Sequence, residues 1–214
     1  MEVGAEQSTP VSFYATQHPP EHLILPQTQT FMNFLRALLA IFILGLLTLM
    51  PVYAQQTFPA LDASPADISY FREARNAPPV IKVLYGRPQK KGREIFGVLE
   101  PFGKVWRAGA NESTEIRFYQ EVTIDGKRIA AGTYTLFVIP NAENWTIILN
   151  ADTDTWGAYS YKPENDVLRV DVPVQHLDEV AEVFSIVFTK AEAEKTATMT
   201  MAWDQTKVEL PISY

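Results

Sequence analysis

The pattern of hydrophobic and polar positions divides the chain into an apolar segment near its start and a long region of short alternating segments. From residue 80 onward, short runs rich in Val, Ile, Phe, Tyr and Thr recur between Gly, Pro, Asn and Asp. Such runs predict β-strands. Residues 133–140 are apolar or threonine on both faces and predict a central strand. Residues 168–172 and 184–188 alternate and predict strands with one solvated face.

Turn residues place the remaining strands. Asp125-Gly126 separates two short strand-like runs and predicts a two-residue β-hairpin. Further strands are expected over residues 80–85, 115–119, 122–124, 127–130, 145–150, 198–203 and 208–212. About nine or ten strands with regular turns predict an all-β fold, a single antiparallel β-sandwich over residues 66–214.

One short helix is expected at the start of this domain. Ser64-Pro65-Ala66-Asp67 has a capping residue, a first-turn proline and an early acidic residue. These features are typical of a helix N-terminus, so a helix is predicted within residues 62–75.

The first quarter of the chain has the order of an export signal. A basic region ends in Arg36, an apolar run covers residues 37–50, and small residues precede a cut after Ala54. We therefore expect a signal peptide over residues 32–54. The alternative is an uncleaved signal anchor, a transmembrane segment over residues 34–53. Residues 1–31 are expected to be disordered or to precede the true start at Met32, and residues 55–65 to form a linker.

Composition and charge narrow the classes of partner. The 214 residues are 47% hydrophobic and 20% charged, which is ordinary for a globular protein. There is no cysteine, which excludes disulfides and thiolate metal sites. Residues 55–214 contain 17 basic and 22 acidic residues, a net charge of −5. Nucleic acid is not an expected partner, since its binding requires basic patches.

The stretch from Lys104 to Thr114 combines an aromatic ring, two cations, an amide and a carboxylate, and therefore has the character of a binding site. Gly109 lies between two alanines, where the backbone can turn or approach a neighbour closely. Arg107 presents a planar guanidinium that suits a carboxylate or phosphate. The structural alternative is an internal ion pair of Arg107 with Glu112, with Asn111 in a turn and Trp106 in the core.

Aromatic residues with polar edges suggest where a ligand would bind. Trp156, Tyr159 and Tyr161 lie in a glycine-containing loop and suit sugar faces or peptide segments, unless they fill the core. The candidate ligand-binding residues are Arg87, Arg93, Trp106, Arg107, Asn111, Glu112, Trp156 and Tyr159.

Catalytic groups are hard to assemble. His176 is the only histidine after residue 54 and lies in a polar stretch typical of a surface position. Glu112 and Glu115 would serve glycoside cleavage only as a correctly spaced pair, but nothing in their spacing singles them out, and a solvated face is the favoured explanation. No catalytic residue, metal ligand or cofactor is predicted.

Several motifs carry a family resemblance, and they agree in order and spacing. They are Tyr85-Gly86-Arg87-Pro88, Lys91-Gly92-Arg93-Glu94-Ile95-Phe96-Gly97, Pro101-Phe102-Gly103-Lys104-Val105-Trp106-Arg107-Ala108-Gly109-Ala110-Asn111-Glu112, Gly132-Thr133-Tyr134-Thr135-Leu136-Phe137, Ile139-Pro140 and Trp156-Gly157-Ala158-Tyr159. Residues 66–214 resemble the bacterial domain-of-unknown-function family 2911. The resemblance implies an exported bacterial protein and brings no activity, cofactor or catalytic residue.

We expect a non-catalytic binding module of the cell envelope, exported to the periplasm or outside the cell, with a sugar, anion or peptide as ligand. The alternatives are a structural envelope protein without a small ligand and an enzyme of unrecognised type acting on carbohydrate. Contact with a membrane is expected only through an uncleaved leader. The oligomeric state stays open.

Overall fold

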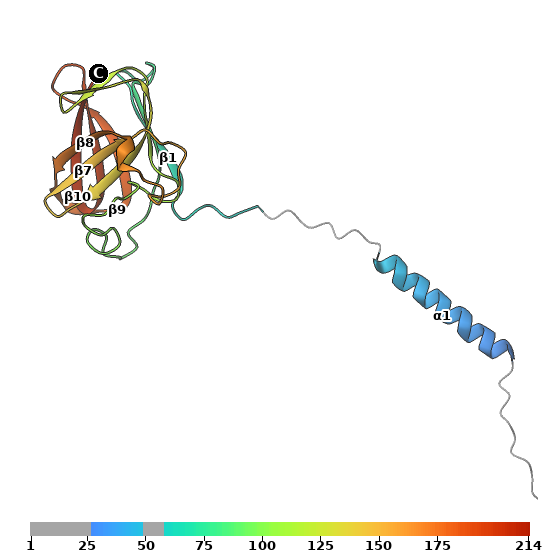
Figure 1. Ribbon diagram of the computed structural model, residues 1–214. Coiled ribbons are helices and arrows are strands. Elements are labelled where there is room, and N and C mark those ends of the chain that lie inside the picture. The colour runs from blue at the N-terminus through green and yellow to red at the C-terminus, as the bar shows by residue number, and fades with distance from the viewer. Residues whose placement is uncertain (1–26, 49–57) are drawn as a thin grey trace, which may run out of the picture. The chain divides into compact units, whose positions relative to one another are not determined.

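The computed structural model of the chain describes residues 27–48 and 58–214. It divides the chain into two compact units, Met1–Phe58 and Pro59–Tyr214, which are described separately (Figure 1). The first contains the helix α1 (Gln27–Thr48), and the second contains the strands. Residues 1–26 and the predicted cleavage site after Ala54 lie outside the described residues.

Helix α1 is mostly apolar over residues 31–47, with Asn33 and Arg36 as the polar exceptions. The side chains of residues 28–46 are all exposed, and the segment Thr28–Leu46 is long and apolar enough to cross a membrane. A signal sequence near the N-terminus has the same properties. The helix therefore fits either a signal sequence or an anchor. It begins at Gln27, five residues before Met32, and no proline lies between Gln27 and Thr48 to interrupt it.

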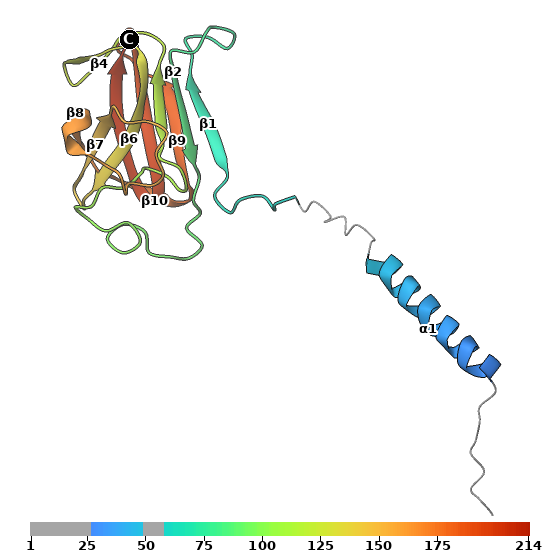
Figure 2. The same cartoon turned by 45° about the vertical axis from the view of Figure 1, so that its right-hand side comes forward.

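The second unit is an antiparallel β-sandwich, as predicted (Figure 2). One sheet has the order β1-β2-β3-β6-β7-β8 and the other the order β5-β4-β10-β9. The ten strands of the described residues are β1 (Ala66–Phe71), β2 (Ile81–Gly86), β3 (Glu115–Phe118), β4 (Val122–Ile124), β5 (Lys127–Ile129), β6 (Gly132–Pro140), β7 (Asn144–Asn150), β8 (Asp166–Pro173), β9 (Gln175–Lys190) and β10 (Thr196–Ser213).

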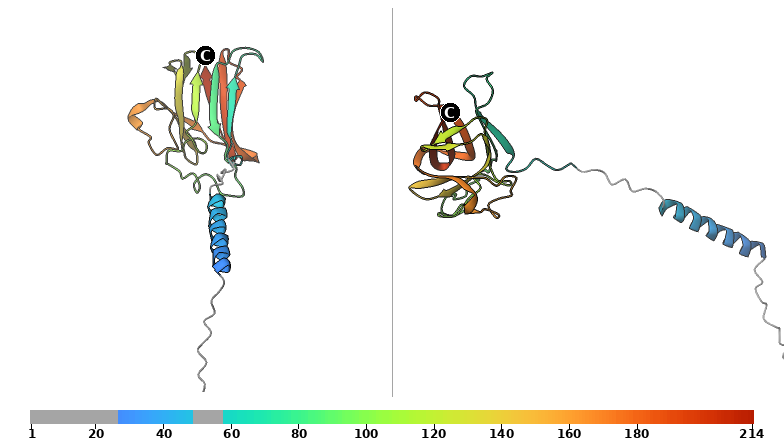
Figure 3. Two further views of the ribbon diagram at one scale, coloured as in Figure 1. Left: turned by 90° about the vertical axis from the view of Figure 1, so that its right-hand side faces the viewer. Right: turned by 45° about the horizontal axis from the view of Figure 1, so that its top comes forward.

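The strand and hairpin predictions are largely confirmed. β6 lies in the interior of its sheet between β3 and β7, which explains its two apolar faces. Asp125 and Gly126 both have positive φ, 48° and 74°, and join β4 to β5 as a two-residue hairpin. The end of β10 pairs with β4 at Ser213 and Thr123, so the C-terminus lies beside this hairpin (Figure 3).

The core between the sheets is centred on aromatic rings. Trp106 stacks on Trp203 with centroids 5.9 Å apart and meets Trp145 edge to face at 6.1 Å. Trp145, Phe184 and Trp203 are fully buried, as their positions in the strands predict. Phe188, expected to be buried, is only partly so and packs at the edge of the core.

The helix predicted within residues 62–75 is wrong, because residues 66–71 form strand β1. The strand pairs with β2 in register from Ala66↔Gly86 to Phe71↔Ile81. Phe71 is buried against the core. The local capping signal predicts only what an isolated segment prefers, and the backbone partners and apolar contact offered by the sandwich override it.

The two C-terminal strands predicted over residues 198–203 and 208–212 are one long strand, β10. Asp204, which suggests a turn, has a positive φ of 55°. The pairing of β10 with β9 shifts register on either side of Asp204. A β-bulge accepts such a residue without ending the strand, so the two predicted segments join.

Candidate functional site

The stretch from Lys104 to Thr114, which contains half of the candidate residues, meets the interior strand β6 at Trp106. Trp106 and Val138 exchange both backbone hydrogen bonds, with N···O distances of 2.7 and 2.9 Å. The hydroxyl of Thr114 donates to the carbonyl of Ala108 at 2.7 Å. Ala108 is in the left-handed region with φ of 51°. These contacts fix the backbone on both sides of Arg107.

Two glycines bring this stretch against the end of β2. A Cβ built on Gly86 would lie 2.1 Å from the carbonyl oxygen of Ala110, and one built on Gly109 would lie 2.9 Å from that of Gly86. Only glycine fits this approach. The predicted role of Gly109 is therefore confirmed, with Gly86 as the partner.

Asn111 anchors the stretch to the segment that precedes β1. Its side-chain amide donates to Asp62 Oδ1 at 3.1 Å and to the carbonyl of Ser64 at 3.4 Å. Hydrogen bonds from the backbone of Ser64 and from Asn111 lower the pKa of Asp62. Asn111 has a positive φ of 64°, which asparagine tolerates. Its side-chain amide therefore has partners within the protein.

The loop that contains Trp156 is hydrogen-bonded to this stretch. Glu112 and Trp156 form an isolated antiparallel β-bridge. Ser113 N donates to the carbonyl of Thr155 at 3.0 Å, and its hydroxyl donates to the carbonyl of Gly157. Ser113 is buried, so these hydrogen bonds satisfy polar groups away from water. The contacts hold Trp156 beside the stretch.

The junction of these loops with β2 and β3 forms a cavity of about 490 Å³, the Trp156 pocket. Its lining residues are Ala66, Leu84, Tyr85, Gly86, Glu112, Ser113, Glu115, Asp154, Thr155 and Trp156. Three of them are carboxylates, and none is basic. Glu115 accepts a hydrogen bond from the backbone of Asp154 at 3.1 Å. Trp156 is 55% exposed, so a large aromatic face is presented to solvent.

A smaller cavity of about 270 Å³, the Arg107 pocket, involves the same two loops. Its lining residues are Glu100, Val105, Trp106, Arg107, Ala158 and Tyr159. Gly157 is required beside it, because its φ is +64° and a Cβ there would lie 2.7 Å from the ring of Tyr159. Burial raises the pKa of Glu100 to about 7, although the charges of Arg107 and Arg93 act in the opposite direction.

The structure therefore separates the predicted site residues into groups. Glu112 and Trp156 lie in the first pocket, and Arg107 and Tyr159 in the second. Trp106 is buried in the aromatic cluster and contributes only a wall of the Arg107 pocket. The alternative of a buried Arg107–Glu112 pair is wrong, since Glu112 is exposed and no ion pair joins the two among the described residues.

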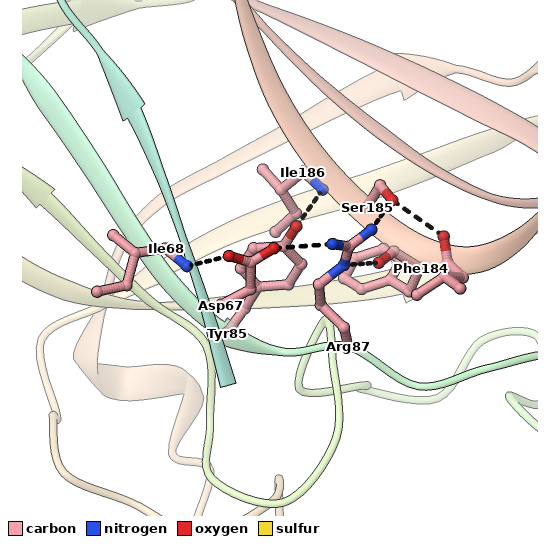
Figure 4. Close-up of polar contacts among 8 residues, drawn as sticks. Asp67, Ile68, Tyr85, Arg87, Phe184, Ser185 and Ile186 are labelled. Carbon is pink, nitrogen blue, oxygen red and sulfur yellow. Dashed lines mark hydrogen bonds and ion pairs between the residues drawn. The ribbon is translucent and has the colours of Figure 1, made fainter. Parts of the chain in front are cut away.

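Arg87 holds the two sheets together and lines neither pocket. Its guanidinium pairs with Asp67 at 2.9 Å and donates to the carbonyl of Phe184 and the hydroxyl of Ser185 (Figure 4). All three guanidinium nitrogens therefore have protein partners. Arg93 is exposed on the loop after β2 and donates to the carbonyls of Lys90 and Gln89. Arg87 therefore lies apart from Arg107, whereas Arg93 lies near enough for its charge to act on Glu100 in the Arg107 pocket.

Two site carboxylates were not predicted from the sequence. Glu100 stands in the apolar stretch Val98-Leu99-Glu100-Pro101-Phe102, and a lone acid in such surroundings is a signal for a perturbed group. Asp154 stands in the run Asn150-Ala151-Asp152-Thr153-Asp154, whose composition is typical of a turn. Its φ of 56° and its backbone bond to Glu115 place it on the pocket wall.

Metal and histidine chemistry gain no support from the part of the chain that the structure describes. No group of three His, Cys, Asp or Glu residues there is placed to hold a metal ion. His176 is exposed on β9.

The comparison with protein-family models matches about two thirds of the chain. The model of a family described as "Protein of unknown function (DUF2911)" matches residues 70–212. This range contains Arg107, Glu112 and Trp156 and most of the sandwich. No curated protein and no solved structure matches the chain.

Proposed function

The chain belongs to the DUF2911 family of proteins of unknown function, and from this premise we propose that it is an exported, non-catalytic saccharide-binding protein of the cell envelope. The ligand would be a neutral or amine-bearing sugar residue in the Trp156 pocket. The exposed ring of Trp156 beside three carboxylates in a cavity of about 490 Å³ is the observation that carries the proposal.

The chemistry of the pocket favours a sugar over the other ligand classes. Aromatic rings pack on the apolar faces of sugars, and carboxylates accept hydrogen bonds from their hydroxyl groups. Glu112, Glu115 and Asp154 would repel an anion, and no basic side chain lines the pocket to offset them. The pocket also has the size and the mixed apolar and polar lining of small-molecule sites.

Binding to the intact chain tests the proposal. Full-length protein in a polyoxyethylene detergent, which carries no sugar headgroup, is titrated calorimetrically with cello- and chito-oligosaccharides. Trp156→Ala is expected to weaken binding at least about tenfold, or 1.4 kcal/mol. Of the four tryptophans, only Trp156 is exposed, so its fluorescence reports occupancy directly.

Tyr119→Ala is the matched control, because Tyr119 is an exposed aromatic residue that lines neither pocket. This variant is expected to bind as the wild type does. Equal binding by Trp156→Ala and wild type, or the absence of binding to any saccharide tested, would contradict the proposed function.

Hydrolysis of a carbohydrate is the second candidate, because Glu112 and Glu115 line the same pocket. Glycoside cleavage needs a general acid with a raised pKa. Glu100 has such a pKa, but it lines the other pocket. Binding is therefore favoured, and release of nitrophenol from aryl glycosides that is lost in Glu112→Gln and Glu115→Gln would favour the enzyme instead.

A further inference from the structure

Arg107 has a guanidinium whose hydrogen-bonding capacity is mostly unused. Its Nε donates to the carbonyl of Gly109 at the long distance of 3.4 Å. Its two terminal nitrogens donate to no residue that the structure describes, and it forms no ion pair there. Arg87, in contrast, has a partner for every guanidinium nitrogen. A half-buried arginine with free donors on a cavity wall is suited to binding an oxyanion.

Glu100 shares this cavity but does not neutralise Arg107. No ion pair joins Glu100 to Arg107 or to Arg93, the two cations that act on its ionisation. Burial raises the pKa of Glu100 to about 7, so a large fraction of this carboxyl is protonated near neutral pH. A cation and an acid therefore line one cavity of about 270 Å³ without an ion pair between them.

We propose that the Arg107 pocket is a second binding site, which holds one carboxylate group of a ligand between the Arg107 guanidinium and the Glu100 carboxyl. The guanidinium donates to the ligand carboxylate, and the protonated Glu100 carboxyl donates one further hydrogen bond. Tyr159 is 86% exposed and places an aromatic face at the opening for the rest of the ligand.

Proton uptake follows from this arrangement. Ionised Glu100 repels a carboxylate and competes for Arg107, whereas neutral Glu100 donates to it. Affinity is therefore expected to fall about tenfold between about pH 6 and pH 8. Near pH 7, binding is expected to draw a proton onto Glu100. This site is independent of the saccharide proposal, because its probe contains no sugar.

N-acetylalanine, which bears a single carboxylate, is the probe, and its neutral amide is the matched ligand. Titration calorimetry of the full-length protein in two buffers of different ionisation enthalpy measures affinity and proton uptake together. The acid is expected to bind at least about tenfold more tightly than the amide. Arg107→Gln is expected to lose this preference. Glu100→Gln is expected to keep binding but to lose proton uptake and pH dependence.

Arg117→Gln is the control, since Arg117 is an exposed arginine outside both pockets. It is expected to behave as the wild type, and circular dichroism confirms that each variant is folded. Equal affinity for acid and amide, or binding unchanged in folded Arg107→Gln, would overturn the proposal. Binding of inorganic phosphate without N-acetylalanine would overturn the assignment to carboxylates.

Discussion

Gly86 and Gly109 allow two backbone segments to meet beside the Trp156 pocket. The carbonyl oxygen of Ala110 occupies the space where a Cβ of Gly86 would lie. The Cβ and the carbonyl oxygen are each bonded directly to the backbone, which cannot rotate away as the end of a long side chain can. The position of Glu112 two residues later thus depends on the lack of a side chain at residue 86.

Gly86→Ala is expected to destabilise the fold by about 1–3 kcal/mol or more, because the new methyl group must displace backbone. Urea unfolding of Gly86→Ala and of Gly132→Ala measures the effect. Gly132→Ala is the matched control: its nearest contacts lie at 3.5 Å and belong to the side chain of Tyr134. Equal losses of stability in the two variants would show that the close approach is not what requires Gly86.

Glu100 makes the stability of the fold depend on pH. Its pKa is about 7 in the folded protein against 4.5 for an ordinary glutamate, so the folded state holds the proton more tightly. The resulting stabilisation is complete below about pH 4.5 and is lost as the pH rises to about 7. Wild type is therefore expected to lose about 1–3 kcal/mol relative to Glu100→Gln across this range, and none beyond it.

Chemical denaturation of wild type and Glu100→Gln at a series of pH values checks this. Glu179→Gln, which removes an exposed carboxylate on β9, is the control and is expected to follow the wild type. A stability difference between wild type and Glu100→Gln that stays constant across the range would show that burial does not perturb Glu100.

Strand β1 shows why elements with a clear hydrophobic pattern were predictable and this one was not. The apolar pattern of β6 and the Asp125-Gly126 turn each lie within a few consecutive residues, and those residues suffice to predict the element. In β1, the helix signal at Ser64 and Pro65 is also local. The pairing with β2 and the burial of Phe71 nevertheless determine that this segment is a strand. The sequence of the segment alone does not show those contacts.

Phe71 is expected to be the anchor of β1. Its ring lies 6.4 Å from that of Phe188 on β9 and 5.1 Å from that of Tyr214, so it links the two sheets. Phe71→Ala should cost about 3–5 kcal/mol in the free energy of unfolding. Tyr70→Ala, at an exposed position of the same strand, should cost within about 1 kcal/mol. Similar costs in thermal unfolding would contradict the assignment of Phe71 as anchor.

The candidate site was predictable in its residue types but not in its pairings. Arg87 and Arg107 look alike in the sequence, yet the guanidinium of Arg87 is held by Phe184 and Ser185 on β9. The separation in sequence between these partners is about half the chain, and only the topology brings them together. The raised pKa of Glu100 follows from burial in the folded protein, and the spacing of residues in the sequence does not reveal that burial.

Considered as a whole, the chain joins an apolar helix to a sandwich whose core is complete within residues 59–214. The buried hydrophobic residues of that core all lie between Phe71 and Ile212. Helix α1 adds none of them, since its described side chains are exposed. The sandwich thus has a core of its own, and the apolar helix fits a signal sequence or an anchor.

Removal of the leader is expected when the protein is made in a bacterium with an intact export pathway. The order of basic, apolar and small residues up to Ala54 predicts a mature chain that begins at Gln55. Intact mass spectrometry of the exported protein measures this directly. Ala54→Phe should block the cut, because the residue before it must be small, and should hold the full chain in the membrane fraction. A wild-type mass that retains residues 34–53, with the protein in membranes, would instead make α1 a permanent anchor, since its length suffices to span a bilayer.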